Sequence, residues 1–128
     1  MTIAEVAERY GLTIDTLRYY ERVGLLPPVT RGKGGIRDYG EIDCQWVDFI
    51  VCMRGAGVAV AALLEYVALF KQGDGTREAR KKILQEQRRL LAKRMDDMKT
   101  ALDKLDFKVA YYDTAIRAAE DQLTRKEK

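Results

Sequence analysis

The chain has 128 residues, with 23 Lys and Arg against 20 Asp and Glu, no histidine and two cysteines. This length suits one small domain with an additional arm, and no apolar run is long enough to cross a membrane. The net charge of +3 is uneven, because residues 76–128 carry +5 and residues 41–75 carry −3. Charge alone is therefore weak evidence for a nucleic-acid partner, since the excess lies on a stretch whose pattern predicts a solvated helix.

The first two predicted elements are short helices joined by a tight turn. Thr2 and the glutamate three residues later have the spacing of a capping box, which predicts a helix over residues 2–8. Gly11 suits the left-handed backbone of a turn, and Thr13 is a good N-cap for a second helix over residues 13–21. Two helices joined in this way predict a helix-turn-helix unit, whose second helix enters the DNA major groove.

The second of these helices has a face suited to contact with DNA. Ile14 and Leu17 share an apolar side, while Arg18 and Tyr19 point away from it. A planar cation beside a phenol hydroxyl is suited to phosphate oxygens and base edges. The alternative is a packed core helix that carries only a surface ion pair between Arg18 and Glu21.

Residues 29–39 predict a basic hairpin. Pro27 and Pro28 end the preceding helix, and residues 29–31 and 36–39 can form two short strands around a glycine-rich loop. The cations of the hairpin are Arg31, Lys33 and Arg37. Such a hairpin directly after a helix-turn-helix is typical of a wing that touches the DNA backbone, and the alternative is an ordinary solvated connector.

Two further helices are predicted over residues 41–54 and 60–70. Apolar residues recur in both at spacings of three and four, which indicates one buried face in each helix. A polar break that contains glycine follows at residues 71–75.

A different pattern begins at residue 76. From Leu91 onward apolar residues alternate at spacings of four and three, which is the seam of a coiled coil. A helix over residues 76–117 would be roughly 60 Å long, too long for the small preceding domain to cover. A second copy of the chain is the simplest partner, and a helix folded back on its own domain is the alternative. The seam residues predicted to form the dimer are Leu91, Met95, Met98, Leu102, Leu105, Val109 and Tyr112.

Four short motifs carry a resemblance to a known family. They are Ile-Ala-Glu-Val-Ala at residues 3–7, Leu-Arg-Tyr-Tyr-Glu at 17–21, Gly-Leu-Leu at 24–26 and Arg-Asp-Tyr at 37–39. Together they resemble the winged helix-turn-helix of MerR-type transcriptional regulators. The resemblance implies a mainly α fold, with a winged helix-turn-helix DNA-binding domain at residues 1–72, an antiparallel coiled-coil dimerisation helix at 76–120 and a charged, frayed tail at 121–128.

The resemblance also implies which side chains contact DNA. In the family, the arginine and tyrosine positions of the second and the last motif do so. The first turn of the second helix and the loop of the hairpin add polar and basic groups beside them. The predicted DNA-binding residues are Thr13, Thr16, Arg18, Tyr19, Tyr20, Lys33, Arg37 and Tyr39.

The two cysteines predict neither a disulfide nor a metal site within one chain. Cys44 and Cys52 lie eight residues apart on one predicted helix. That spacing is about 12 Å along the axis, whereas a disulfide needs Cα atoms within about 7 Å. Because the chain has no histidine, no metal and no cofactor are predicted, and a metal site shared across a dimer is the alternative. No phosphate-binding loop, nucleophile motif or carboxylate pair indicates an enzyme.

By the resemblance, Cys52 occupies the position of the reactive cysteine in the thiol-based subgroup of the family that responds to aldehyde and nitrosative stress. Arg54, or a basic residue of a partner arm, would then favour the reactive thiolate. The alternative is that Cys52 packs as a small hydrophobe, as free cysteines usually do. Cys44 is interpreted as incidental.

The resemblance therefore implies a homodimer that binds double-stranded promoter DNA at a palindrome. When Cys52 is modified, the dimer would distort the DNA so that RNA polymerase engages both promoter elements. The residues alone leave open an architectural or adaptor protein, or a repressor, that binds DNA without a thiol response. No signal-peptide pattern is found at the N-terminus, so the protein is expected in the cytoplasm, without a membrane partner.

Overall fold

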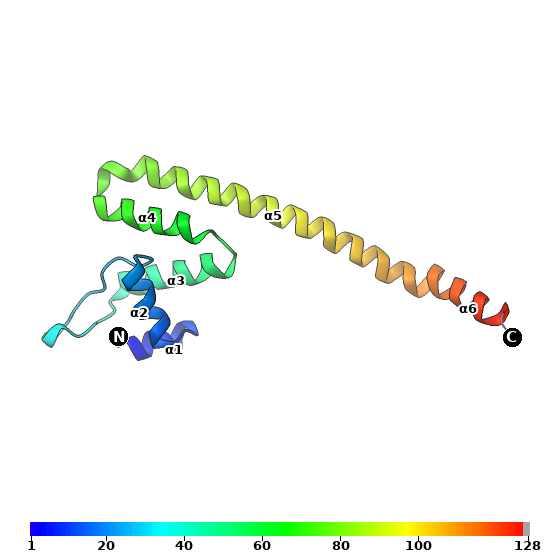
Figure 1. Cartoon of the computed structure of the whole chain (residues 1–128), viewed down its shortest axis with the longest axis horizontal. Helices are drawn as coiled ribbons and strands as arrows, with labels where there is room; N and C mark the ends of the chain where they lie inside the picture. Colours follow the sequence, from blue (N-terminus) through cyan, green and yellow to red (C-terminus); the bar gives the residue numbers. More distant parts are fainter. Residues whose placement is uncertain (127–128) are drawn as a thin grey trace. The chain divides into compact units, whose positions relative to one another are not determined.

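A computed structural model describes residues 1–126, except for the side chains of residues 116, 125 and 126. The described part consists of helices and loops (Figure 1). The elements are α1 (Ile3–Tyr10), α2 (Ile14–Val23), the 3-10 turn η1 (Lys33–Gly35), α3 (Glu41–Gly55), α4 (Val60–Gln72), the 3-10 turn η2 (Asp74–Thr76), α5 (Arg77–Tyr111), the π-helical segment η3 (Tyr112–Ile116) and α6 (Arg117–Lys126). The chain divides into two units, of which the first covers residues 1–89 and the second begins at residue 90.

The helix-turn-helix forms where the capping residues predict it. The Thr2 hydroxyl accepts a hydrogen bond from the backbone N–H of Glu5, and the Glu5 carboxylate accepts one from the N–H of Thr2, at 3.2 and 3.0 Å. Gly11 ends α1 with a φ of 68°, a left-handed conformation that glycine adopts without strain. The Thr13 hydroxyl then accepts from the N–H of Thr16 and begins α2. Both helices end two residues later than predicted.

The core of the first unit is built mainly by α1, α2 and α3, together with the segment after α2. Its most deeply buried side chains share an apolar character and come from each of these elements. They are Val6, Leu17, Leu25, Leu26, Tyr39, Val47, Ile50, Val58 and Val67. The core therefore fixes α2 on its apolar side and leaves its opposite side exposed.

The hairpin contains less sheet than predicted. Instead of two strands, the described residues hold one antiparallel bridge between Arg31 and Arg37, which brings two backbone hydrogen bonds of 2.8 Å, from Gly32 to Ile36 and from Asp38 to Thr30. The connection is the 3-10 turn η1, the short coil at the tip of the loop that follows α2 (Figure 1). Its consecutive glycines Gly34 and Gly35 both have a φ of 73°. Beyond this bridge the backbone of Tyr39 pairs with Met1, whose amino group donates to the Tyr39 carbonyl and whose carbonyl accepts from the Tyr39 N–H, both at 2.8 Å. Two short strands by themselves form only a marginally stable ladder.

An aromatic cluster joins α3 to α4. The Trp46 ring lies 4.8 Å from the Phe70 ring and 5.9 Å from the Tyr66 ring, measured between centroids. The Arg80 guanidinium, at the start of α5, lies 5.5 Å from the centroid of the Phe70 ring. The beginning of α5 therefore runs beside α4 (Figure 1). The two helices predicted after the hairpin are thus confirmed, with α3 ending one residue later and α4 two residues later.

The second unit presents the predicted seam to solvent. The six seam residues from Met95 to Tyr112 are at least half exposed. The helix changes to π geometry at η3, where the Thr114 hydroxyl donates to the carbonyl of Ala110 at 3.3 Å. Residues 121–126 of the tail predicted to be frayed are helical, and residues 127 and 128 lie outside the described part of the chain. In the part that is described, no helix is long and apolar enough to span a membrane.

Candidate nucleic-acid interface

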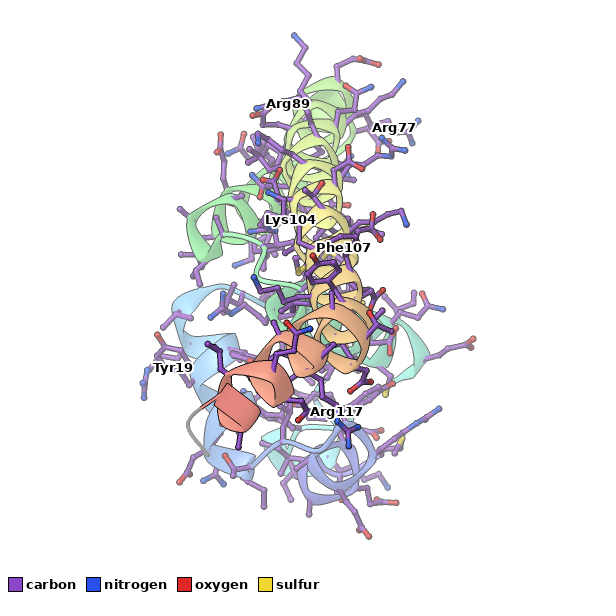
Figure 2. The ribbon with its side chains drawn as sticks, turned by 90° about the vertical axis from the view of Figure 1, so that its right-hand side faces the viewer. Tyr19, Arg77, Arg89, Lys104, Phe107 and Arg117 are labelled. Carbon is purple, nitrogen blue, oxygen red and sulfur yellow. The ribbon has the colours of Figure 1, made fainter. Side chains whose placement is uncertain are left out.

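The exposed side of α2 carries a cation and an aromatic ring. Arg18 is 56% exposed and its guanidinium is 3.9 Å from the carboxylate of Asp15, a loose pair on the surface. Tyr19 is 48% exposed and projects outward from the helix (Figure 2). The guanidinium of Arg22 lies 5.5 Å from the Tyr19 ring centroid. This surface therefore offers a phenol and two arginines to a phosphate or a base edge.

The two threonines of the first turn of α2 serve the helix itself. The Thr13 and Thr16 hydroxyls are hydrogen-bonded to each other at 2.8 Å, and the Thr13 hydroxyl also accepts from the Thr16 N–H at 3.0 Å. Thr13 is exposed and Thr16 is half-buried. The structure thus shows Thr13 as the N-cap of α2, with the Thr16 hydroxyl bonded to it. The predicted contact of both residues with DNA stays a prediction.

A carboxylate links α2 to the hairpin. The Glu21 Oε1 accepts a hydrogen bond from Arg31 Nη2 at 3.0 Å, and its Oε2 accepts from Arg37 Nε at 2.8 Å. Arg31 Nη1 also donates to the carbonyl of Gly35 at 3.2 Å, within the loop. The alternative pair of Arg18 with Glu21 is therefore wrong, because Glu21 turns toward the hairpin and both of its oxygens are taken there.

The predicted contact of Tyr39 with DNA is wrong, because the side chain is buried. Its side chain is only 2% exposed because the ring packs in the core, so it offers no surface for direct contact with DNA. Its hydroxyl has no hydrogen-bond partner among the described residues. Burial, and then the nearby Glu21 carboxylate, raise the pKa of Tyr39 above its usual 10.0. The Tyr39 side chain thus packs in the core and does not project from the surface of the hairpin.

The remaining predicted residues differ in accessibility. Tyr20 is half-buried and packs against the core, while its carbonyl accepts hydrogen bonds from the N–H groups of Leu25 and Leu26. Lys33 is exposed in η1 at the tip of the hairpin, and Arg37 is half-buried beside Glu21. The structure therefore brings the exposed face of α2 and the hairpin cations to one region through Glu21.

Three residues of this surface are not among the eight predicted DNA-binding residues, although Arg31 is one of the cations of the predicted wing. Arg22 and Arg31 are exposed cations beside Tyr19 and Glu21 respectively, and Glu21 itself joins the two elements. The spacing of Tyr19 and Arg22, three residues apart on one helix, is a signal available in the sequence. The partners of Glu21 lie 10 and 16 residues away, and no helical spacing reveals them.

The two cysteines have different surroundings. Cys44 is buried, with its sulfur 4.0 Å from that of Met1, and Cys52 is exposed near the end of α3. The guanidinium of Arg54 donates to the carbonyl of Val58 at 3.2 Å, across the loop that follows α3. An exposed thiol contradicts the alternative that Cys52 packs as a buried hydrophobe within its own chain.

Comparison with known proteins supports this assignment of elements. A model of the MerR HTH family of regulatory proteins matches residues 1–69. The chain is 59% identical to the HTH-type transcriptional regulator AdhR of Bacillus subtilis over 91 residues, which are 71% of this chain and 65% of that protein. It is 32% identical to an HTH-type transcriptional regulator of Haemophilus influenzae over 114 residues, which are 89% of this chain and 84% of that one.

Solved structures show the same fold. A MerR family transcriptional regulator of Listeria monocytogenes superimposes with a TM-score of 0.88 at 44% identity, over 99% of this chain and 96% of that one. HiNmlR is a MerR family regulator lacking the sensor domain, and its crystal structure was solved bound to promoter DNA. It superimposes with a TM-score of 0.80 at 31% identity, over 91% of this chain and 92% of that one. These similar proteins are transcriptional regulators and not enzymes. With its helix-turn-helix, its hairpin and its long helix, the chain belongs to the MerR family of HTH transcriptional regulators.

Proposed function

We propose that this protein is a homodimer that binds a palindromic promoter through two copies of α2 and its hairpin, and that RNA polymerase is its further partner there. The observation that carries the proposal is the exposed pair of Arg18 and Tyr19 on α2, joined to the cationic hairpin by Glu21. The likeness to HiNmlR, which was crystallised on promoter DNA, supports this use of the fold. A recognition helix and a wing supply contacts to bases and to the backbone respectively.

The exposed seam supports the dimer. Apolar side chains that recur at alternating spacings of four and three would be covered by the same stripe of a second copy. Burial of this stripe stabilises the pair by roughly 25 cal/mol for each Å² removed from water. A dimer also doubles the number of phosphate contacts, which matters because the first 40 residues carry a net charge of only +1.

We further propose that Cys52 is the effector site. Cys52 is an exposed residue, whereas Cys44 is 8% exposed, so an electrophile in solution reaches Cys52 more readily. The thiolate adds to the carbonyl carbon of an aldehyde, and the resulting alkoxide takes a proton from water to give a hemithioacetal. The other modification that the proposal includes is transnitrosation by an S-nitrosothiol, in which the Cys52 thiolate attacks the nitrosyl nitrogen, the S–N bond of the donor breaks, and the donor leaves as its thiolate. Either adds polar atoms at the end of α3.

The modification would act on DNA through the conformation of the dimer. A regulator whose two states hold DNA with different twist changes the free energy of deforming the promoter between its elements. Activation by this route needs no new contact between the effector and DNA. It requires only that the modified and unmodified dimers differ in their affinity for the distorted promoter.

The test is a footprint combined with a transcription assay on the promoter upstream of the protein's own gene. Wild type is compared with Cys52→Ser and with the matched control Cys44→Ser, each with and without a reactive aldehyde. Arg18→Ala provides a variant in which binding itself is impaired. We expect wild type and Cys44→Ser to protect a palindrome and to activate only with the aldehyde, and Cys52→Ser to bind equally and to stay silent.

Other results separate the parts of the proposal. Binding by all cysteine variants without any response to the aldehyde would leave a DNA-binding architectural protein or repressor. A response that is lost in Cys44→Ser and kept in Cys52→Ser would move the effector site to the buried cysteine. Unchanged affinity of Arg18→Ala for the operator at matched salt would contradict the assigned recognition surface.

A further inference from the structure

Glu21 is bonded to two arginines at once, each through its own carboxylate oxygen. The distances are 3.0 Å to Arg31 and 2.8 Å to Arg37, and the Glu21 side chain is only 15% exposed. Three charged groups therefore meet in one place, where α2 ends and the hairpin closes. Charge-assisted hydrogen bonds of this length in a partly water-excluded site hold both partners in a defined orientation.

These hydrogen bonds use some of the N–H donors of Arg31 and Arg37 and leave others unused. Arg37 uses its Nε, and among the described residues neither of its Nη groups has a hydrogen-bond partner. Arg31 uses one Nη for Glu21 and the other for the loop carbonyl of Gly35. Because a guanidinium is planar and its five N–H groups are fixed, the bond at Nε determines where the two Nη groups of Arg37 point.

The same carboxylate has an opposite effect on attraction to DNA. A negative charge on a surface that faces phosphates is repulsive, and it reduces the net charge of this cluster from +2 to +1. Binding that depends only on charge is thus weakened by Glu21. Binding that depends on the placement of the arginines is strengthened by it, provided that the recognition helix and the wing contact the operator together.

We propose that Glu21 is a positioning residue for operator recognition, which holds Arg31 and Arg37 so that the hairpin and α2 read DNA as one rigid surface, at a cost in non-specific affinity. This inference rests on the proposed function, in which that surface binds promoter DNA. It makes a prediction of opposite sign for two kinds of DNA, which neither a purely repulsive nor a purely structural role of Glu21 makes.

The experiment compares wild type with Glu21→Gln in the full chain. Fluorescence anisotropy measures binding to the operator duplex found by footprinting and to an unrelated duplex of the same length, at several salt concentrations. We expect Glu21→Gln to lower the affinity for the operator about tenfold, which is the scale of one oriented arginine contact. Affinity for the unrelated duplex is expected to rise, with a steeper dependence on salt.

Asp15→Asn is the matched control, because it removes a carboxylate from the exposed side of the same helix without touching the hairpin. We expect it to raise the affinity for both duplexes alike. If Glu21→Gln behaves like Asp15→Asn, Glu21 only repels phosphate and the inference is wrong. If Glu21→Gln weakens binding to both duplexes alike, its role is structural and the inference is equally wrong.

A double variant tests the route through Arg37. If Glu21 acts by orienting Arg37, Glu21→Gln lowers the affinity for the operator clearly less in the Arg37→Gln background than in wild type. Additive losses would overturn this route. Failure of the proposed function is visible separately, since wild type would then show no preference for any duplex, whereas failure of the inference leaves that preference intact.

Discussion

Tyr39 combines an apolar ring that belongs in the core with a hydroxyl that has no hydrogen-bond partner among the described residues. A buried hydroxyl without a partner costs free energy, because it gives up hydrogen bonds to water and gains none in return. The same burial raises the pKa of the phenol, since the phenolate is even less favourable away from water. For this residue, burial thus determines both the contribution of the hydroxyl to the free energy of unfolding and the direction of its pKa shift.

Replacement of Tyr39 by phenylalanine is therefore expected to raise the free energy of unfolding by about 1 kcal/mol, measured by urea denaturation at pH 7. The variant also tests the pH dependence. The unfolded chain ionises Tyr39 near pH 10, whereas the folded chain holds the proton to higher pH, so wild type loses stability as the pH rises above about 10. That alkaline loss should be smaller in Tyr39→Phe. A destabilised variant at pH 7 would show that the hydroxyl has a partner in solution.

At the scale of an element, α2 is defined by its two ends. Thr13 begins it through a side-chain hydrogen bond, and Gly24 ends it with a φ of 89°. Between these ends one side is buried at Leu17, and the opposite side carries the exposed arginine and tyrosine. The orientation of the recognition surface thus depends on caps that do not themselves need to contact DNA.

Thr13→Ala separates the capping role from the predicted contact with DNA. Loss of the cap should lower the free energy of unfolding by about 1 kcal/mol, measured by thermal or urea denaturation. Thr13→Ser keeps the hydroxyl and is expected to retain both stability and affinity for the operator. If Thr13→Ala keeps its stability and loses only operator binding, the hydroxyl serves DNA and not the helix.

At the scale of the whole molecule, the proposed assembly depends on the seam of α5. Leu102 is 56% exposed in the single chain and lies on the seam, whereas Phe107 is 68% exposed and its sequence position lies off the seam. Exposure alone therefore does not distinguish the dimer surface from other apolar side chains on this helix. The alternating spacing of the seam makes that distinction.

Leu102→Lys is expected to convert the dimer to monomers in analytical ultracentrifugation, because a charge in a coiled-coil seam is desolvated without a partner. Phe107→Lys is the matched control on the same helix, and it should remain a dimer. Dissociation by both variants, or by neither, would contradict the predicted seam. A monomeric Leu102→Lys should also bind a palindromic operator more weakly, since it presents only one recognition surface at a time.

Features that depend on neighbouring residues along the chain can be predicted without a structure. The capping box at Thr2, the left-handed turn at Gly11 and the N-cap at Thr13 each depend on a few adjacent residues, so their positions were predicted and confirmed. The long helix followed from a repeated spacing. The family followed from motifs whose order and separation are visible without a structure.

Contacts between residues that are far apart in the sequence become visible only in the folded chain. Helical spacing suggests Arg18 as a partner for Glu21, which is the alternative that the sequence leaves open, yet in the folded chain Glu21 binds two arginines of the hairpin. Tyr39 was placed on the DNA surface by its motif, and the core took its ring instead. The two predicted strands are reduced to one bridge, and the backbone of Tyr39 pairs with that of Met1, which is distant in the sequence. In each case the favoured arrangement depends on contacts between residues that are distant in the sequence, and the spacing of neighbouring residues does not reveal such contacts.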